Sequence, residues 1–159
     1  MRPLDRIDFE ILDSLQNNAR LSNKELAARV GIAPSTCLER VRRLIEEKVL
    51  LGFHARVAPR AMGIGIEAMI SVRLTKHSRE LVEDFAEWAI ALPFVREIYH
   101  MAGANDYLIH VVARDAGHLR DLAMSSFTTR PEVEHLETAL IFSHEESRAL
   151  PVFAAPEED

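Results

Sequence analysis

Three arginines on one short segment have the clearest potential for chemistry: Arg40, Arg42 and Arg43. A guanidinium group donates two parallel hydrogen bonds to O6 and N7 of guanine, and a good pair of this kind discriminates between bases by about 1–3 kcal/mol. We therefore predict that Arg40 or Arg43 reads bases, whereas Arg42, Lys24 and Arg20 bind phosphates. The candidate DNA-contacting residues are Ser22, Lys24, Ser35, Thr36, Glu39, Arg40, Arg42 and Arg43.

Charge is distributed unevenly along the chain. The 159 residues carry a formal net charge of −6, which by itself argues against a polyanionic partner. Residues 1–60, however, contain 11 Lys and Arg against 8 Asp and Glu, so their net charge is +3. Residues 61–159 hold the other 8 and 17, which gives −9. A local basic surface in the first part of the chain can therefore still attract phosphates.

The arginines need a helix to carry them. We predict one over residues 34–47, because proline is favoured at the first helical position and Pro34 stands there. Its apolar face consists of Leu38, Val41, Leu44 and Ile45. The opposite face carries Thr36, Glu39, Arg40 and Arg43, with Ser35 and Arg42 on the flanks. Ala33 provides no capping side chain, and the loss of such a cap typically costs ~1 kcal/mol.

Two shorter helices precede this one. An apolar stripe at helical spacing predicts a helix with one buried face that ends near Asn17. Ser22 and Glu25 have the spacing of a capping box, so the next helix is predicted to begin at Ser22. Gly31 can take the left-handed conformation that ends a helix tightly. Two helices joined by a tight turn with a glycine predict a helix-turn-helix.

The second half of the chain predicts an α+β domain. Apolar and polar residues alternate from 66 to 75, as in a strand with one buried face. Ser78 and Asp115 are predicted to cap helices, and two strands around residues 103–106 to form a hairpin. This βαββαβ order is that of a ferredoxin-like fold. The predicted organisation is a helix-turn-helix domain of winged-helix type over 1–50, a linker strand over 51–62, a ferredoxin-like domain over 63–150 and a C-terminal tail over 151–159.

Other classes of function have little support from the residues. Cys37 is the single cysteine, so we predict no zinc site built from several cysteines and a packed position for its side chain. The seven histidines are scattered, so we expect no metal and no other cofactor. An apolar run of ~18 residues and a signal-peptide pattern are both missing, which favours a cytoplasmic protein without membrane contact.

With both halves considered, the chain resembles the leucine-responsive/asparagine-regulator (Lrp/AsnC, or feast-famine) family of bacterial and archaeal transcription regulators. The resemblance rests on an ordered series of motifs: Leu4-Asp5-Arg6-Ile7-Asp8, Ile11-Leu12, Leu26-Ala27, Val30-Gly31, the run from Pro34 to Leu44, and Gly52. It implies an N-terminal winged helix-turn-helix and a C-terminal βαββαβ domain. That C-terminal domain typically drives dimers, often assembled into octamers, and senses amino acids.

The resemblance also implies an effector site. In this family, a turn that contains a glycine and an aspartate follows the second strand of the C-terminal domain. It matches residues 103–107 of this chain, in which Gly103 is the glycine and Asp106 the aspartate. Ala104 and Asn105 depart from the common pattern, so the chemistry that faces the ligand is altered. By resemblance, the effector-binding residues are Gly103, Ala104, Asn105, Asp106, Tyr107, Thr138 and Ala139. Backbone N–H and C=O groups of this loop would bind the carboxylate and ammonium groups of an amino acid.

The expected function is a homo-oligomeric, sequence-specific transcription regulator that binds double-stranded DNA and responds to an amino acid. An alternative is a nucleoid-type architectural protein that bridges or wraps DNA with low sequence specificity. The ratio of operator affinity to random-DNA affinity distinguishes the two. A third hypothesis, catalysis in the ferredoxin-like domain, has no nucleophile–base pair or phosphate-binding glycine loop to support it.

Overall fold

The structure, a computed structural model, describes residues 3–75, 78–147 and 149–154. Its contacts divide the chain into two compact units. Unit 1 runs up to Arg56 and includes the segment from Glu145 onward, whereas unit 2 spans Val57–His144. The predicted ferredoxin-like domain, 63–150, therefore extends beyond the end of unit 2. Of the predicted tail, residues 155–159 lie outside the described part of the chain.

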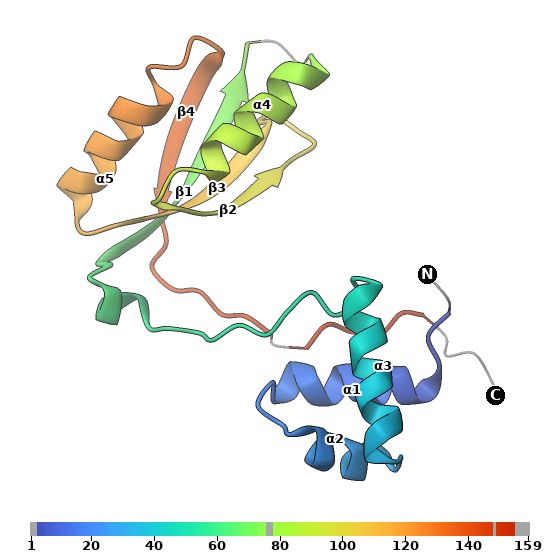
Figure 1. Cartoon of the computed structure of the whole chain (residues 1–159). Coiled ribbons are helices and arrows are strands. Elements are labelled where there is room, and N and C mark those ends of the chain that lie inside the picture. Colours follow the sequence, from blue (N-terminus) through green and yellow to red (C-terminus); the bar gives the residue numbers. More distant parts are fainter. Residues whose placement is uncertain (1–2, 76–77, 148, 155–159) are drawn as a thin grey trace. The chain divides into compact units, whose positions relative to one another are not determined.

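The described residues of unit 1 form three helices, α1 (Arg6–Asn17), α2 (Asn23–Val30) and α3 (Pro34–Glu46) (Figure 1). Capping boxes begin the first two helices, formed by Asp5 with Asp8 and by Ser22 with Glu25. Gly31, at a φ of 72°, ends α2 in the left-handed conformation. As the sequence predicted, no side chain caps α3. The predicted helix-turn-helix is confirmed.

A small apolar core holds the three helices together. Each helix contributes to it, and its buried members are Ile11, Leu15, Leu26, Ala27, Val30, Cys37 and Leu44. The buried position predicted for Cys37 is confirmed, and burial raises the pKa of its thiol. Because a thiol with a raised pKa forms less thiolate, this residue is poorly suited to nucleophilic or redox chemistry.

The linker differs from its prediction. Residues 51–58 form neither helix nor strand, and a 3₁₀-helical turn, η1 (Pro59–Met62), follows them. The linker strand predicted over 51–62 is therefore wrong for this structure. A strand requires a neighbour that completes its hydrogen-bond ladder, and within the described chain none of the four strands pairs with this segment.

Unit 2 is a four-stranded antiparallel sheet with helices on one face (Figure 1). Its elements are β1 (Ile66–Leu74), α4 (Arg79–Ile90), β2 (Val95–His100), β3 (Tyr107–Ala113), α5 (Ala116–Leu122), a π-helical turn over Ala123–Phe127, and β4 (Val133–Leu140). The strand order β2-β3-β1-β4 is that of the ferredoxin-like topology, so the predicted fold class is confirmed. Ser78 and Asp115 cap α4 and α5 as predicted.

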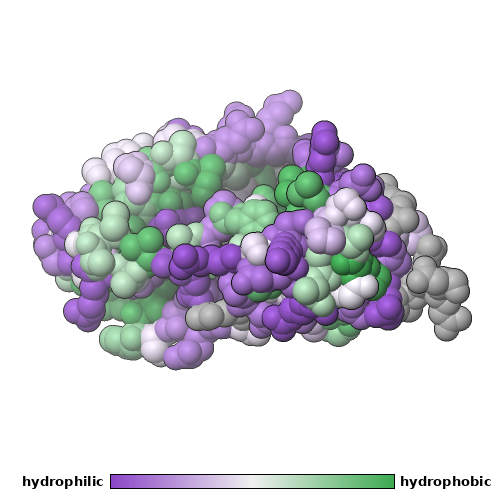
Figure 2. Space-filling view, turned by 60° about the horizontal axis from the view of Figure 1, so that its bottom comes forward, coloured by the Kyte–Doolittle hydropathy of each residue, from purple (hydrophilic) through white to green (hydrophobic). Residues whose placement is uncertain are grey.

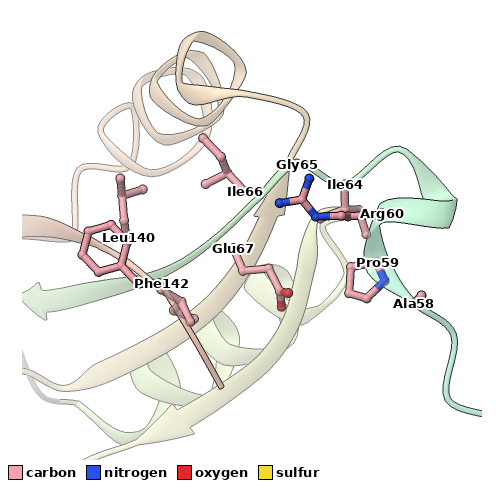
Figure 3. Close-up of a pocket in the computed structure, with 10 residues that line it drawn as sticks. Ala58, Pro59, Arg60, Ile64, Gly65, Ile66, Glu67, Leu140 and Phe142 are labelled. Atoms are coloured by element: carbon pink, nitrogen blue, oxygen red, sulfur yellow. The ribbon is translucent and has the colours of Figure 1, made fainter. Parts of the chain in front are cut away.

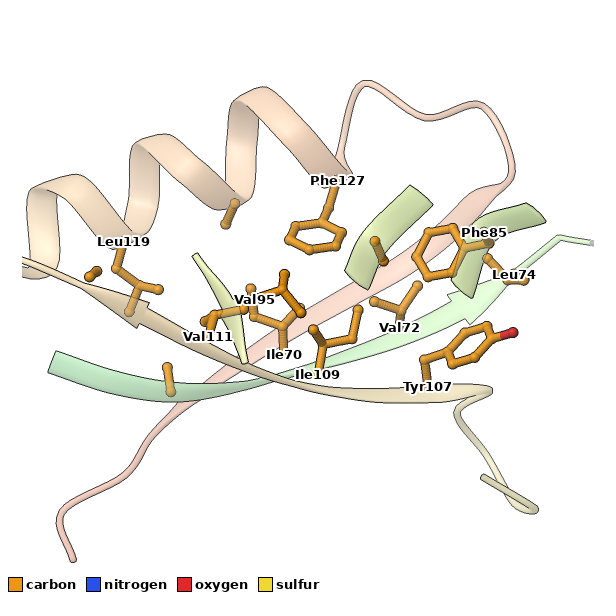
Figure 4. Packing of buried hydrophobic residues seen from close by; sticks show 14 residues of the cluster. Ile70, Val72, Leu74, Phe85, Val95, Tyr107, Ile109, Val111, Leu119 and Phe127 are labelled. Carbon is orange, nitrogen blue, oxygen red and sulfur yellow. The ribbon is translucent and has the colours of Figure 1, made fainter. Parts of the chain in front are cut away.

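The core of unit 2 lies between the sheet and its helices (Figure 4). Alternate residues of β1 point to that side, because side chains of a strand alternate between its faces. Ile70, Val72 and Leu74 are buried there, whereas Met69 and Ser71 belong to the opposite face and are half-buried. The sheet therefore has one face covered by helices and one without helical cover.

Apolar side chains also reach the surface. On the side shown in Figure 2, hydrophobic residues lie among hydrophilic ones at several places. The exposed large apolar side chains include Leu38 and Ile45 on α3, and Tyr99 and Met101 at the end of β2. The two on α3 occupy positions that the sequence assigned to the apolar face of that helix.

Candidate DNA-binding surface and effector site

Helix α3 packs with a different face inward from the one predicted. Cys37 and Leu44 are fully buried, and Val41 between them is half-buried. Leu38 and Ile45, predicted to be buried, are 59% and 45% exposed. The helix is thus rotated about its axis by roughly half of the 100° step that separates neighbouring residues. The predicted inner face of α3 is corrected accordingly.

This rotation brings Arg40 and Arg43 against the start of α1. Arg40 Nη1 lies 2.8 Å from Asp8 Oδ1 and also pairs with Asp5, and Arg43 Nη2 lies 2.9 Å from the same Asp8 oxygen. The Asp8 side chain is fully buried, and those of Arg40 and Arg43 are only 23% and 32% exposed. The Asp5–Asp8–Arg40–Arg43 cluster therefore joins α3 to α1.

The electrostatics of this cluster favour its ion pairs. The hydrogen bond to Asp5 is the largest cause that raises the pKa of Arg40 above its ordinary value, and the bond to Asp8 acts in the same direction. Removing one partner from a buried ion pair typically costs 3–5 kcal/mol, so these arginines are not easily released. The position predicted for both, opposite the buried face, is wrong, because each is held by carboxylates of α1.

The exposed face of α3 carries a different set of polar groups. Ser35, Thr36, Glu39 and Arg42 are all exposed. Arg42 pairs with Glu46 at 2.8 Å across one turn of the helix, and both side chains are largely solvated. Such a surface pair contributes at most about 1 kcal/mol, so the Arg42 guanidinium can exchange Glu46 for another acceptor. The structure thus leaves Arg42 available and occupies Arg40 and Arg43.

The N-terminus of α2 lies beside that of α3. The Asn23 side-chain amide donates to the Pro34 carbonyl at 2.8 Å, which ties the two helix starts together. Lys24 is exposed next to this contact. The Ser22 hydroxyl donates to Glu25 at 2.7 Å and accepts the Glu25 backbone N–H, so it acts as the cap. Hydrogen bonds from Ser22 lower the pKa of the Glu25 carboxyl.

The loop predicted to bind an effector connects β2 to β3, and two of its residues have roles in the fold. Asp106 Oδ2 accepts the Leu74 backbone N–H at 2.7 Å, and the Asp106 N–H donates to the Val72 carbonyl. The Tyr107 ring is buried in the core, where its hydroxyl donates to the Val82 carbonyl at 2.6 Å. Their side chains therefore fix the loop to β1 and to α4.

The rest of the loop borders a small cavity of about 160 Å³. It is lined by Ser71, Met101, Ala102, Gly103, Ala104, Asn105, Tyr107 and Leu108. Gly103 has a φ of 141°, a value that residues with a Cβ rarely adopt. Among the lining residues, Ser71 and Asn105 bring polar side chains to this cavity. Gly103, Ala104 and Asn105 thus line one cavity, and their part in effector binding stays a prediction.

The two predicted effector residues on β4 do not form a common surface. Thr138 is opposite Ile70 and Ala139 opposite Met69 in the sheet register. Directly opposed residues of neighbouring strands share a face, so Thr138 belongs to the helix-covered face and Ala139 to the other. Neither lines the cavity beside the loop. Their part in effector binding stays a prediction.

A larger cavity, of about 530 Å³, lies at another place in unit 2 (Figure 3). It is lined by η1, the start of β1 and the end of β4, and its charged side chains are Arg60 and Glu67. Glu67 Oε2 also lies 3.0 Å from His110 Nε2 on the sheet face without helices. None of the seven predicted effector residues lines this cavity.

Within the described ranges, no group of three or more His, Cys, Asp and Glu residues could hold a metal ion. In the same part of the chain, no helix is both long and apolar enough to cross a membrane.

Comparison with known proteins agrees with the two units. Residues 4–50 match the model of a winged helix-turn-helix DNA-binding domain, and residues 67–150 match that of the Lrp/AsnC ligand binding domain. A DNA-binding domain joined to a ligand-binding domain defines a transcription regulator whose action depends on an effector. Together these matches span most of the chain, which belongs to the Lrp/AsnC family of transcription regulators and is not an enzyme.

Relatives with known names support this assignment. The chain is 43% identical to the HTH-type transcriptional regulator AldR of Mycolicibacterium smegmatis, over 90% of this chain and 84% of the relative. It is 36% identical to the leucine-responsive regulatory protein of Rhizobium meliloti, over 86% and 88%. Both relatives are thus similar along nearly their full length.

Solved structures show the same arrangement of elements. A transcriptional regulator from Neisseria meningitidis in complex with L-Met superposes with a TM-score of 0.85 at 28% identity, over 93% of this chain and 96% of that one. AsnC from E. coli gives a TM-score of 0.82 at 25% identity, over 94% and 99%.

Three residues of unit 1 that position the candidate site were missed by sequence reasoning. Asp5 and Asp8 hold α3 through its arginines, and Asn23 ties the two helix starts together. The spacing of Asp5 and Asp8, three residues apart at a helix start, could have indicated a capping role. Their arginine partners lie 32 to 35 residues away in the sequence, so local patterns could not reveal the ion pairs.

Proposed function

We propose that this regulator binds DNA in a sequence-specific manner through the exposed face of α3, with the N-terminus of α2 on the phosphates. The observation that carries the proposal is the separation of the arginines into two kinds. Arg42 is 79% exposed in a weak surface pair, whereas Arg40 and Arg43 are bound to a buried carboxylate. The proposed recognition residues are then Ser35, Thr36, Glu39 and Arg42, and Ser22 and Lys24 contact the phosphate backbone of the DNA.

In this proposal Arg42 takes the base-reading role that the sequence predicted for Arg40 or Arg43, and Arg43 holds the helix in position. Arg42 lies near the middle of the solvent-facing stripe and is placed to reach base edges in a major groove. Arg43, on the border of that stripe, is largely engaged with Asp8. The arginine that fixes the helix is thus distinct from the arginine that reads DNA.

We propose that the functional form is at least a dimer. One recognition helix buries too little surface for tight binding, and two helices about 34–36 Å apart would read successive turns of the groove. The sheet face without helices carries apolar side chains, including Met69, Leu108 and Val112. An apolar face of this kind favours association with a second copy. Double-stranded DNA as the target implies action in the cytoplasm, at the nucleoid.

Replacing Arg42 by alanine is expected to weaken binding to a selected DNA site by about 1–3 kcal/mol, and to random DNA by less, because a base contact is lost.

Lys24→Ala is expected to weaken binding to the selected site and to random DNA equally. It should also reduce the slope of log K against log salt concentration by about 1, because a phosphate contact is lost. Fluorescence anisotropy of labelled duplexes at several salt concentrations measures both effects.

A matched control for Arg42→Ala is Arg6→Ala. Arg6 also forms an exposed i,i+4 pair, with Glu10, but lies on α1. If Arg6→Ala lowers specific affinity as much as Arg42→Ala does, the effect is one of net charge and the proposed recognition face is wrong. A wild-type ratio of selected-site to random-DNA affinity near one would instead support the architectural alternative.

We propose further that the effector is an amino acid and that it binds at the loop between β2 and β3. The cavity there combines backbone N–H and C=O groups with the Asn105 side chain and the apolar Met101 and Leu108. These are the groups that an amino acid needs for its charged ends and its side chain. The similar regulator from Neisseria meningitidis, which was solved as a complex with L-Met, supports the ligand class.

Asn105→Ala is expected to weaken amino-acid binding about tenfold, because one hydrogen bond to a charged group is lost. Isothermal titration with a panel of amino acids measures affinity, and light scattering on the same samples reports the change in assembly. Arg60→Ala, at the larger cavity, is the control and is expected to leave the affinity unchanged. If Arg60→Ala weakens amino-acid binding and Asn105→Ala does not, the effector binds at the larger cavity instead.

A further inference from the structure

Leu38 stands out on the DNA-facing side of α3. Its side chain is 59% exposed, although leucine is among the residues most often buried in folded proteins. The core beneath α3 is filled by Cys37 and Leu44 from the other side of the helix. Leu38 therefore does not complete the interior of unit 1.

The surroundings of Leu38 on the helix surface are mixed: Pro34 and the half-buried Val41 are apolar neighbours, and two further neighbours are polar. Residues three and four apart are neighbours on a helix, so Ser35 lies one turn before Leu38 and Arg42 one turn after it. Both neighbours are exposed. Ile45, the other exposed apolar residue of α3, lies in its last turn. The N-terminal part of a recognition helix contacts base edges, so Leu38 is better placed to do so than Ile45.

One apolar group is available in the major groove of DNA. The C5-methyl group of thymine projects into that groove and is read by apolar side chains, whereas the other major-groove positions that distinguish the base pairs are hydrogen-bond donors and acceptors. A leucine between a hydroxyl and a guanidinium group has a complementary partner there. We infer that Leu38 is a specificity-determining residue that packs against a thymine methyl group when α3 enters the major groove.

This inference rests on the proposed DNA-binding face and adds a rule for the sequence that it selects. Leu38 and Arg42 are four residues apart, which is about 6 Å along the helix, or roughly two base-pair steps of 3.4 Å. A selected half-site should therefore contain a thymine within about two base pairs of the base that Arg42 contacts.

The test removes the methyl group from the DNA and the leucine from the protein separately. Full-length wild-type protein first selects duplexes from a random library. Each thymine of the selected site is then replaced by deoxyuridine, which lacks only the C5-methyl group, and affinities are measured for wild type, Leu38→Ala and the control Ile45→Ala. At one thymine per half-site, wild type and Ile45→Ala should lose about fourfold in affinity, which equals the ~0.8 kcal/mol of one buried methyl group. Leu38→Ala should bind the thymine and deoxyuridine duplexes equally at that position.

The outcomes separate this inference from the proposed function. If wild type selects a site, but wild type and Leu38→Ala lose the same affinity at every deoxyuridine substitution, the inference is overturned and the recognition face is left intact. Sensitivity lost in Ile45→Ala alone also overturns it, because the apolar contact then lies at the other end of α3. A wild-type protein that selects no site contradicts the proposed function itself. Because each comparison is made with one protein on two duplexes, a loss of folded protein in a variant does not imitate the effect.

Discussion

Replacing Asp8 by asparagine is expected to lower the free energy of unfolding of unit 1 by about 3 kcal/mol. The carboxylate is fully buried and binds two guanidinium groups, and breaking a buried pair costs 3–5 kcal/mol. The lower end applies because both arginines are partly exposed, so water can solvate the charges that lose their partner. The asparagine oxygen can still accept hydrogen bonds but carries no charge, and the NH2 group that replaces the second oxygen cannot accept from a guanidinium group.

Hydrogen exchange of the backbone amides of α1 and α3 measures this change. Fluorescence would not, because the single tryptophan, Trp88, lies on α4 in unit 2. The control is Asp13→Asn on the same helix, which removes the same charge from an exposed position and keeps the oxygen that accepts from Asn17. A surface substitution of this kind changes stability by less than about 0.5 kcal/mol. Equal losses in the two variants would mean that the cluster does not hold α3.

The same substitution has a functional consequence. Releasing Arg40 and Arg43 makes the surface of α3 more positive while loosening its orientation on α1. Affinity for random DNA should therefore be maintained, because it depends on charge, whereas affinity for a selected site should fall, because it depends on geometry. The ratio of the two affinities reports directly on the positioning role of Asp8.

Replacing Gly65 by alanine is expected to lower the stability of unit 2 by about 3 kcal/mol. A Cβ at this position would lie 2.2 Å from the Arg114 carbonyl oxygen, and the obstacle is backbone that cannot rotate away. The Gly65 N–H donates to the Ala113 carbonyl at 3.0 Å, so the clash occurs where β1 joins β3. Forcing extra atoms into a packed site typically costs 1–3 kcal/mol, and the upper end applies to a backbone obstacle.

Urea unfolding followed by Trp88 fluorescence measures this loss, because Trp88 contacts Phe85 and Phe127 in the core of unit 2. Gly63→Ala is the matched control two residues earlier. Gly63 has a φ of 76°, but a Cβ there meets nothing within 4 Å, so only the backbone strain of about 1 kcal/mol is expected. If Gly63→Ala costs as much as Gly65→Ala, steric contact with Arg114 is not the cause.

Much of the architecture followed from local patterns in the sequence. The capping box of Ser22 and Glu25 and the glycine at 31 placed α2 to within a residue, because caps involve only neighbours in the chain. The alternation along β1 identified its buried face, because a strand has a period of two wherever it lies. The linker strand failed for the complementary reason, since a strand exists only where another strand pairs with it.

The loop predicted to bind an effector holds two kinds of residue. Gly103, Ala104 and Asn105 line one cavity, and effector binding there stays a prediction. The side chain of Tyr107 points into the core instead, and the Asp106 carboxylate caps a backbone N–H of β1. Strand register determines both outcomes, because it decides to which face a side chain belongs. The sequence shows the residues of the loop but not the register of the strands that enclose it.

The sequence by itself determined that α3 exists, where it begins and which residue types it carries. Only the tertiary structure decided which of its arginines stays exposed and which is held by carboxylates, because that depends on the rotation of the helix on its neighbours. The amphipathic pattern predicted Leu38, Val41, Leu44 and Ile45 as the inward face, whereas Asp8, 32 residues before Arg40, favours a different one through its buried charge. A buried carboxylate strongly favours cationic partners, so an ion pair between residues far apart in the sequence contributes to an inward face that local periodicity predicted wrongly.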